Sequence, residues 1–160
     1  MKVLAIDPGY EKVGVAVIEG TRNKPSLTYS ACLKTKRVLA HEKRLFQIAE
    51  TLNNLIERFK PNCLAIEELF FVKNQKTALK VAEARGVILS EAARKDIPVC
   101  QYTPLEVKIA LTGYGRADKS QVTAMVRKLL PLDGRRREDD EFDAIAIGLT
   151  CLTSQNRFKI

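Results

Sequence analysis

The chain opens with Lys2-Val3-Leu4-Ala5-Ile6-Asp7-Pro8-Gly9, a short apolar run that ends in an acid and a turn signal. Residues 3–7 are therefore predicted to form a core strand that stops at Pro8-Gly9. Two further strand-like runs follow at residues 13–19 and 27–33, with turn-forming residues between them. Connections this short predict an antiparallel meander of three neighbouring strands.

The rest of the chain alternates helical and strand patterns. Apolar residues recur every three or four positions over residues 41–59, which predicts a helix. Strands are expected at 63–67 and 98–102, and further helices at 77–93, 104–111, 118–130 and 139–152. Thr103 and Asp118 have the sequence context of helix N-caps. The order βββαβαβααα predicts an α/β fold, a five-stranded mixed sheet flanked by helices, in one domain over residues 1–160 with a short flexible tail.

Composition narrows the class of protein. The 160 residues are 46% apolar and 29% charged, which excludes disordered and fibrous chains. No apolar run approaches the roughly 20 residues of a membrane span, and the start lacks a secretory leader, so we expect a cytoplasmic protein without a membrane partner. The four cysteines are too widely spaced for a zinc site and predict free core thiols.

The net charge of the chain indicates which kinds of partner it could attract. Lys and Arg number 27 against 19 Asp and Glu, a formal charge of +8. Such an excess attracts phosphate backbones, membrane surfaces or acidic proteins, and a solvated basic face without a partner explains it equally well.

Acidic side chains stand where predicted core elements end. Asp7 closes the first strand, and Glu67 closes the fourth. If these strands are neighbours, both carboxylates face one gap at the rim of the sheet. Asp140 and Asp143 lie three positions apart at the start of the last helix, so they share a face of it. Taken singly, each acid is explained as well by a turn, a solvated strand end or a helix cap.

Taken together, the four carboxylates predict a metal site. Converging carboxylates raise one another's pKa values, and a divalent cation removes that cost. Oxygen ligands without His or Cys favour Mg²⁺, with Mn²⁺ as the alternative ion. Two such ions about 4 Å apart support phosphodiester hydrolysis. An acidic centre in a basic protein is therefore typical of a metal-dependent nuclease.

The ordered motifs of this chain resemble the RuvC family of bacterial Holliday junction resolvases. The resemblance covers nearly the whole chain and rests on Ala5-Ile6-Asp7-Pro8-Gly9, Ala65-Ile66-Glu67, Lys73-Asn74, Ala78-Leu79-Lys80, Ala84-Arg85-Gly86, Lys119-Ser120-Gln121-Val122 and Asp140-x-x-Asp143-Ala144-x-Ala146-Ile147. It implies an RNase H-like fold and a crossover junction endodeoxyribonuclease of DNA recombination and repair. It also implies a homodimer that makes paired symmetric nicks in four-way junction DNA, with the RuvA-RuvB branch-migration complex as partner.

The resemblance also assigns site residues. It implies two Mg²⁺ ions per active site, held by four acids: Asp7, Glu67, Asp140 and Asp143. The family's catalytic-site lysines fall on Lys108 and Lys119, and either would stabilise charge on the scissile phosphate, with a solvated helix lysine as the ordinary alternative for each. Lys119 is expected to be the catalytic one. The DNA-binding residues are expected to be Phe70, Lys73, Lys108, Arg116 and Lys119. Phe70 is expected to stack on an unpaired base, with core packing or a dimer contact as equal alternatives.

Two segments keep two interpretations. Arg135, Arg136 and Arg137 either reach phosphate or pair with nearby acids: Glu138, Asp139 and Glu141. The loop Gly113-Tyr114-Gly115-Arg116 either folds around the DNA backbone or is a plain mobile loop.

Two other functions compete with the nuclease. A non-catalytic nucleic-acid-binding protein of the same RNase H-like fold would keep the basic surface, but the presence of all four acids argues against it. The hairpin Asp7-x-Gly9…Gly14 also resembles the phosphate-binding hairpin of actin/hexokinase-like ATPases. Those proteins need two such domains, and 160 residues hold one.

Overall fold

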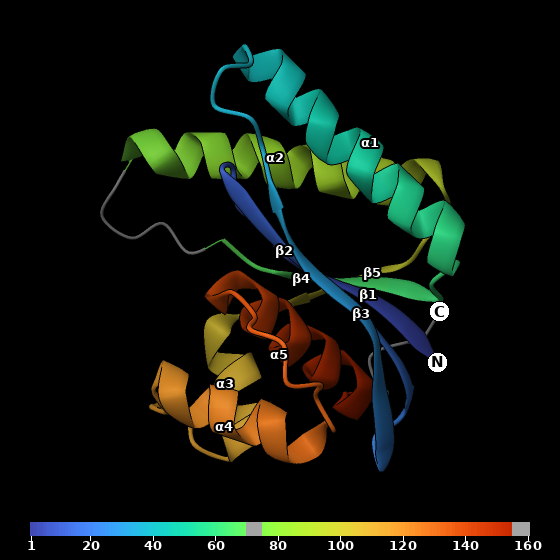
Figure 1. The fold of residues 1–160 in the computed structure, drawn as a ribbon, viewed down its shortest axis with the longest axis vertical. Coiled ribbons are helices and arrows are strands. Elements are labelled where there is room, and N and C mark those ends of the chain that lie inside the picture. Colours follow the sequence, from blue (N-terminus) through green and yellow to red (C-terminus); the bar gives the residue numbers. More distant parts are fainter. Residues whose placement is uncertain (70–74, 155–160) are drawn as a thin grey trace.

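A five-stranded mixed sheet runs through the computed structural model, which describes residues 1–69 and 75–154 (Figure 1). The spatial order is β3-β2-β1-β4-β5. The first three strands are antiparallel neighbours, so the predicted meander is confirmed, and β1 pairs with β4 in parallel. The strands are β1 (Lys2–Asp7), β2 (Lys12–Thr21), β3 (Lys24–Lys34), β4 (Cys63–Glu67) and β5 (Val99–Tyr102).

Helices cover both faces of the sheet. Figure 1 shows α1 and α2 on one face and α5 on the other, with α3 and α4 lying outside α5. Their bounds are α1 (His41–Phe59), α2 (Gln75–Arg94), α3 (Pro104–Thr112), α4 (Lys119–Leu129) and α5 (Asp139–Thr153). The predicted element order is confirmed, and the bounds differ from the prediction by no more than a few residues. Within the described residues, none of these helices combines the length and hydropathy of a membrane span.

The central strand β1 supplies both cores. Val3 and Ala5 belong to the core between the sheet and α5, whereas Leu4 and Ile6 belong to the core under α1 and α2. All four side chains are buried. A strand covered on both faces reads as a continuous apolar run, which is why the first residues of the chain predict a core strand so clearly.

The cysteines only partly match the prediction. No cysteine in the described residues forms a disulfide. Cys63 and Cys151 are buried, with their Sγ atoms 3.8 Å apart, but Cys32 and Cys100 are partly exposed. The expected core position therefore holds for two of the four thiols. The expected C-terminal tail lies outside the described residues.

The predicted caps fix where two helices begin. The Thr103 hydroxyl accepts a hydrogen bond from the Glu106 N–H at 3.1 Å, so α3 starts at Pro104. The Asp118 carboxylate accepts one from the Gln121 N–H at 2.9 Å. Satisfying an otherwise unpaired N–H sets the first residue of the helix, which makes Lys119 the first residue of α4.

Gly14 lets the start of α5 lie directly on the sheet. Gly14 on β2 pairs with Asp7 on β1. A Cβ atom on Gly14 would lie 1.9 Å from the carbonyl oxygen of Asp140 and 3.2 Å from the Cβ of Asp7. Only glycine permits this approach, which brings the first turn of α5 beside the end of β1.

Gly14→Ala is expected to lower the free energy of unfolding by about 1–3 kcal/mol, because the added methyl group forces α5 away from the sheet. Urea unfolding measures the change. The matched control is Gly86→Ala on the exposed surface of α2, where a Cβ meets nothing within 4 Å. This control is expected to stabilise the protein by about 0.5–1 kcal/mol. Equal stability of Gly14→Ala and the wild type would contradict the close approach.

Candidate active site

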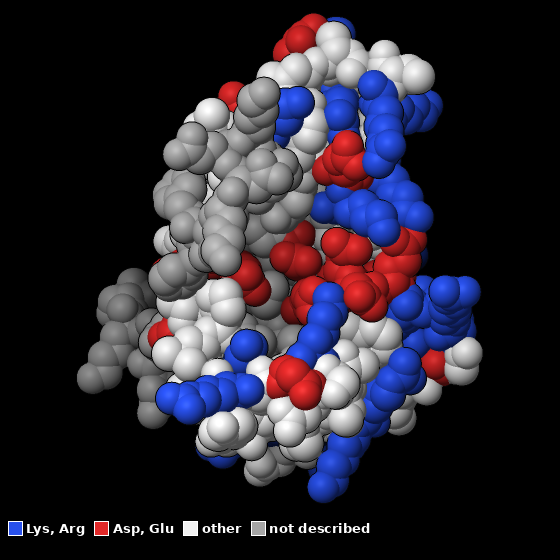
Figure 2. All heavy atoms as spheres, turned by 90° about the vertical axis from the view of Figure 1, so that its left-hand side faces the viewer, with Lys and Arg blue, Asp and Glu red and all other residues white. Residues whose placement is uncertain are grey.

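The four predicted acids come to one edge of the sheet. Asp7 ends β1 and Glu67 ends β4, and these strands are parallel neighbours, so both carboxylates leave the sheet at the same edge. Asp140 and Asp143 lie in the first turns of α5, which starts beside that edge. Figure 2 shows acidic side chains gathered in the middle of this face, with Lys and Arg around them.

The carboxyl group of Asp7 has a strongly raised pKa. Burial, followed by repulsion from Asp143, Glu67 and Asp140, raises the pKa of Asp7 from its ordinary 3.8 to about 7. The nearby Lys119 ammonium opposes this rise in pKa only in part. The carboxylate is therefore short of positive charge in its surroundings.

The pKa values of two further acids, Glu67 and Asp143, are also raised. Burial and the charge of Asp143 raise the pKa of Glu67 from 4.5 to about 7. Burial also raises the pKa of Asp143, although its hydrogen bond from Lys119 works against the rise. Partly buried carboxylates of raised pKa, with oxygen as the only donor atom, form a donor set that fits a hard divalent cation.

Lys119 brings a positive charge to the acids. Its Nζ lies 2.9 Å from Asp143 Oδ2 and 3.4 Å from Asp139 Oδ2. A cavity of about 220 Å³ opens beside this ion pair, with Lys108, Lys119, Asp143 and Glu67 among its lining residues. Apolar atoms of α3, α4 and α5 complete the wall, so charged and apolar groups border the same space.

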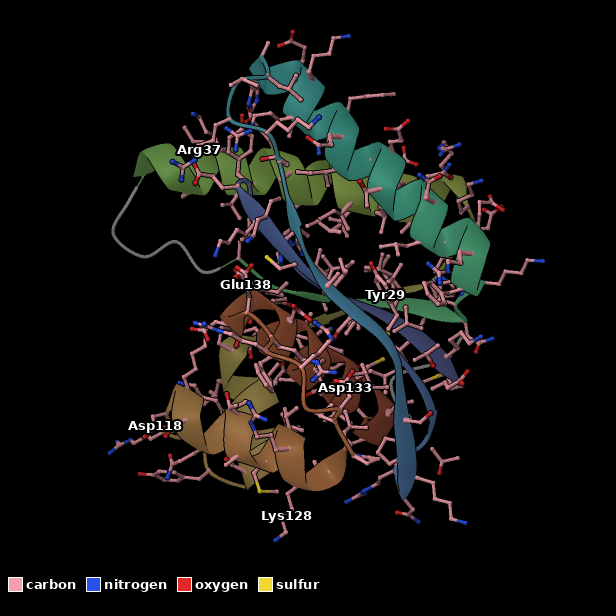
Figure 3. The ribbon with its side chains drawn as sticks, viewed as in Figure 1. Tyr29, Arg37, Asp118, Lys128, Asp133 and Glu138 are labelled. Carbon is pink, nitrogen blue, oxygen red and sulfur yellow. The ribbon has the colours of Figure 1, made fainter. Side chains whose placement is uncertain are left out.

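Asp140 also belongs to a second group of polar side chains. Among the described residues, the three metal-ligand atoms that lie within 4.8 Å of one another come from Cys32, Glu138 and Asp140. The four predicted acids are thus spread more widely than this group. Figure 3 places Glu138 at the start of α5, near β2 and β3.

Lysines already balance the charge of this second group. Lys12 Nζ lies 2.6 Å from Glu138 Oε2 and 4.0 Å from Asp140 Oδ2, and Lys34 also pairs with Glu138. Burial, then the charge of Asp140, raises the pKa of the Cys32 thiol to about 11, so sulfur stays protonated. Through the ion pairs of Lys12 with Glu138 and Asp140, this group anchors Asp140 beside β2 and β3.

The remaining predicted residues are less informative. Lys108 lines the cavity, and Arg116 lies exposed in the loop between α3 and α4. Phe70 and Lys73 lie outside the described residues.

The arginines before α5 pair with acids. Arg135 pairs with Glu141, as one of the two interpretations expected. Arg137 instead pairs with Asp133, a partner that the expectation omitted. Arg136 is exposed and makes no ion pair among the described residues.

Arg85 is a residue near the site to which the sequence analysis assigned no role. Its Nε donates a hydrogen bond to the backbone carbonyl of Glu67 at 3.3 Å, and its guanidinium also contacts Gln101 on β5. Arg85 therefore ties α2 to the ends of two strands. The only sequence signal is its place in Ala84-Arg85-Gly86, which belongs to the family resemblance.

The sheet order and the acids at its edge define an α/β nuclease domain of the RNase H-like class. The family described as "Crossover junction endodeoxyribonuclease RuvC" matches residues 3–151. The chain belongs to the RuvC family of crossover junction endodeoxyribonucleases. The family and fold expected from the sequence are confirmed.

Relatives match almost their whole length. A RuvC of Thermotoga petrophila is 45% identical over 98% of this chain and 94% of its own. One of Desulforamulus reducens is 48% identical over 93% and 91%. Among solved structures, Thermus thermophilus RuvC in complex with a Holliday junction substrate has a TM-score of 0.88 at 36% identity, covering 94% of this chain and 92% of that one.

The raised pKa values predict a stability that depends on pH. Between about pH 4 and 7 the folded chain holds protons on Asp7 and Glu67 that the unfolded chain releases, so the free energy of unfolding falls as pH rises. In chelator, Asp7→Asn is therefore expected to be more stable than the wild type at pH 8, with the difference shrinking toward pH 4. Urea unfolding across this range measures it.

The exposed Asp96, on the turn before β5, gives the matched control. Asp96 has a left-handed φ of 53°, a conformation that asparagine also adopts. Asp96→Asn is expected to follow the wild-type pH profile. Parallel profiles for Asp7→Asn and the wild type would contradict the raised pKa of Asp7.

Proposed function

We propose that this protein resolves Holliday junctions by paired symmetric nicks, through metal-assisted hydrolysis of a phosphodiester, in DNA recombination and repair. The observation that carries the proposal is the pair of carboxylates with pKa values near 7 at the ends of β1 and β4, with acids of α5 beside them. Membership of the RuvC family and the likeness to a junction-bound relative support the same substrate.

The donor set fits a hard divalent cation. We infer that Asp7, Glu67, Asp140 and Asp143 hold the ions, with Mg²⁺ preferred and Mn²⁺ as the substitute. When bound, two such cations supply the charge that activates a water and stabilises the leaving oxygen. Before a cation binds, the proton that a raised pKa keeps on Asp7 limits the repulsion between the acids.

The lysines and the surrounding surface bind the substrate phosphates. Lys119, already beside Asp143, is positioned to neutralise charge on the scissile phosphate, and Lys108 borders the same cavity. The Lys and Arg side chains around the acids in Figure 2 attract the phosphate backbone. Phe70, Lys73 and Arg116 remain proposed DNA contacts, Phe70 by stacking on a base.

A symmetric junction calls for two active sites. A homodimer supplies two identical sites related by a two-fold axis, and such an axis matches the symmetry of a four-way junction. We therefore include a homodimer in the proposal. The RuvA-RuvB branch-migration complex is proposed as a partner on the family relationship alone.

Asp7→Asn is expected to abolish cleavage of a synthetic four-way junction in Mg²⁺ while leaving junction affinity nearly unchanged, because basic residues elsewhere bind the DNA. Nicking is followed on a labelled junction beside a linear duplex, with and without Mg²⁺, and Asp96→Asn serves as the control. Wild-type nicking by Asp7→Asn would refute the role of Asp7. Similar wild-type rates on both substrates would make the enzyme a general nuclease.

Lys119→Ala is expected to slow single-turnover cleavage about 10²–10³-fold, because it removes a charge aimed at the reacting phosphate. Lys128→Ala is the control, since Lys128 lies exposed near the other end of α4 (Figure 3). Equal rates for the two variants would contradict a catalytic role for Lys119.

A further inference from the structure

A buried carboxylate lies beside the proposed metal ligands without belonging to them. Glu141, in the first turn of α5, is 5% exposed and follows Asp140 directly. A buried carboxylate is stable only when its oxygens are hydrogen-bonded or paired with a cation. Its Oε2 accepts hydrogen bonds from the Ser30 hydroxyl at 3.0 Å and from Arg135 Nη2 at 2.7 Å.

Arg135 connects this carboxylate to the edge strand β3. The same Nη2 donates to the backbone carbonyl of Ser30 at 2.8 Å and lies 2.7 Å from its hydroxyl. One guanidinium thus joins β3 to α5, mainly through its Nη2 atom. We call Ser30, Arg135 and Glu141 the Arg135 clamp.

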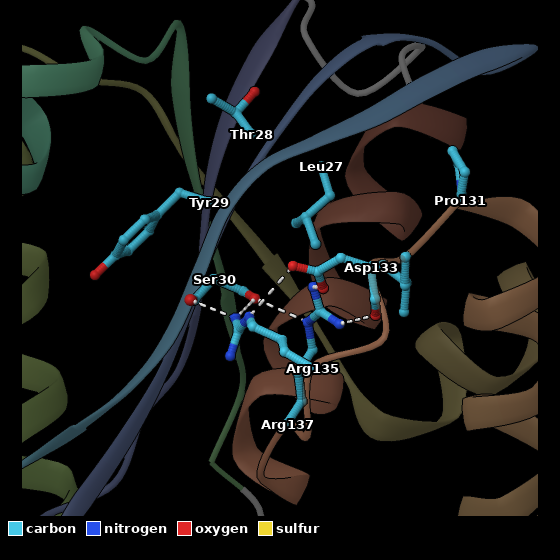
Figure 4. A pocket seen from close by; sticks show the side chains of 9 residues that line it. Leu27, Thr28, Tyr29, Ser30, Pro131, Asp133, Arg135 and Arg137 are labelled. Atoms are coloured by element: carbon cyan, nitrogen blue, oxygen red, sulfur yellow. Dashed lines mark hydrogen bonds and ion pairs between the residues drawn. The ribbon is translucent and has the colours of Figure 1, made fainter.

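Arg137 steadies the clamp from the same loop. Its Nε lies 3.3 Å from the Ser30 hydroxyl, and its other nitrogens bind the carbonyl and carboxylate of Asp133. Figure 4 shows Arg135 and Arg137 reaching from the loop before α5 toward Ser30 on β3.

The loop before α5 borders a cavity on the side of β3. This cavity has a volume of about 420 Å³, and the arginines form part of its wall. The first turn of α5 is held by several contacts: core packing of Phe142, the ion pairs of Glu138 with Lys12 and Lys34, and the close approach of Asp140 to Gly14. The clamp adds polar contacts to β3 on the side of this cavity.

The negative charges at the start of α5 oppose its observed position beside the end of β1. Its first two turns carry Asp139, Asp140, Glu141 and Asp143, and the charges of Asp140 and Asp143 act on the carboxylate of Asp7. Like charges repel at these distances, so the turn is pushed away from the end of β1 unless another contact holds it.

We propose that Arg135 is a positioning residue of the active site, which fixes the first turn of α5 through Ser30 and Glu141 and thereby sets the positions of Asp140 and Asp143 for metal binding. This inference rests on the proposed metal-dependent function. Helical backbone links Glu141 rigidly to both acids, because they lie one and two residues away.

The test is Mn²⁺ binding to the DNA-free protein, measured by calorimetry and by electron paramagnetic resonance. Arg135→Met is expected to raise the Kd for Mn²⁺ about tenfold, because the helical turn that carries two of the proposed ligands loses its contacts to β3. Electrostatics alone predicts the opposite sign, since removing a positive charge near the acids strengthens cation binding. Weaker Mn²⁺ binding by Arg135→Met would therefore show that Asp140 and Asp143 have lost their positions.

Three further variants distinguish an effect of lost charge on Mn²⁺ binding from an effect of lost position or of failed folding. Arg136→Met removes the same charge from an exposed neighbour without an ion pair among the described residues, and it is expected to bind Mn²⁺ at least as tightly as the wild type. Ser30→Ala alters the clamp without changing charge and is expected to weaken binding. If Arg135→Met does not fold, Mn²⁺ binding by Ser30→Ala tests the proposal in its place. Arg135→Lys is expected to restore binding only partly.

Cleavage supplies a second readout. In Arg135→Met the Mg²⁺ concentration for half-maximal cleavage is expected to rise about tenfold, with most of the rate recovered at saturating Mg²⁺ and with junction affinity in chelator unchanged. Wild-type Mn²⁺ affinity in Arg135→Met, or in Ser30→Ala should the former not fold, would overturn the inference. A wild-type protein that binds Mn²⁺ yet cuts no junction would instead overturn the proposed function.

Discussion

Repulsion among partly buried carboxylates at one edge of the sheet is the main electrostatic constraint on this structure. Asp7 ends the central strand, and burial together with three neighbouring acids raises its pKa to about 7. A fold that merely needed stability would replace such a group with an apolar side chain. The proposed function explains this cost, because the same acids would supply oxygen ligands to a divalent cation.

The rest of the structure holds these charges in place. Parallel pairing of β1 with β4 puts two acids on adjacent strand ends, and Gly14 lets the start of α5 approach them. Lys119 pairs with Asp143, while Lys12 and Lys34 pair with Glu138 beside Asp140. The Arg135 clamp adds a tie on the far side of the helix, so attraction from several elements balances repulsion within the site.

Much of this arrangement follows from local signals. The buried strand that stops at Asp7-Pro8-Gly9 and the caps at Thr103 and Asp118 each depend on residues within a few positions of one another along the chain. Long-range pairs were harder to predict. Nearby acids were expected as partners for the arginines before α5, yet Arg137 pairs with Asp133, and Arg135 reaches Ser30, 105 residues away.

The order of the strands and helices, and where each one ends, could be read from the sequence, because hydrophobic periodicity, turn residues and helix caps act over a few residues. The acids at those ends could be read there as well. Only the tertiary structure decided which ends meet. The order β3-β2-β1-β4-β5 brings Glu67 beside Asp7, sets Ser30 within reach of Arg135 and turns Asp140 toward Cys32 and Glu138. Sequence patterns carry no direct record of these contacts, because the sheet joins segments that lie far apart along the chain.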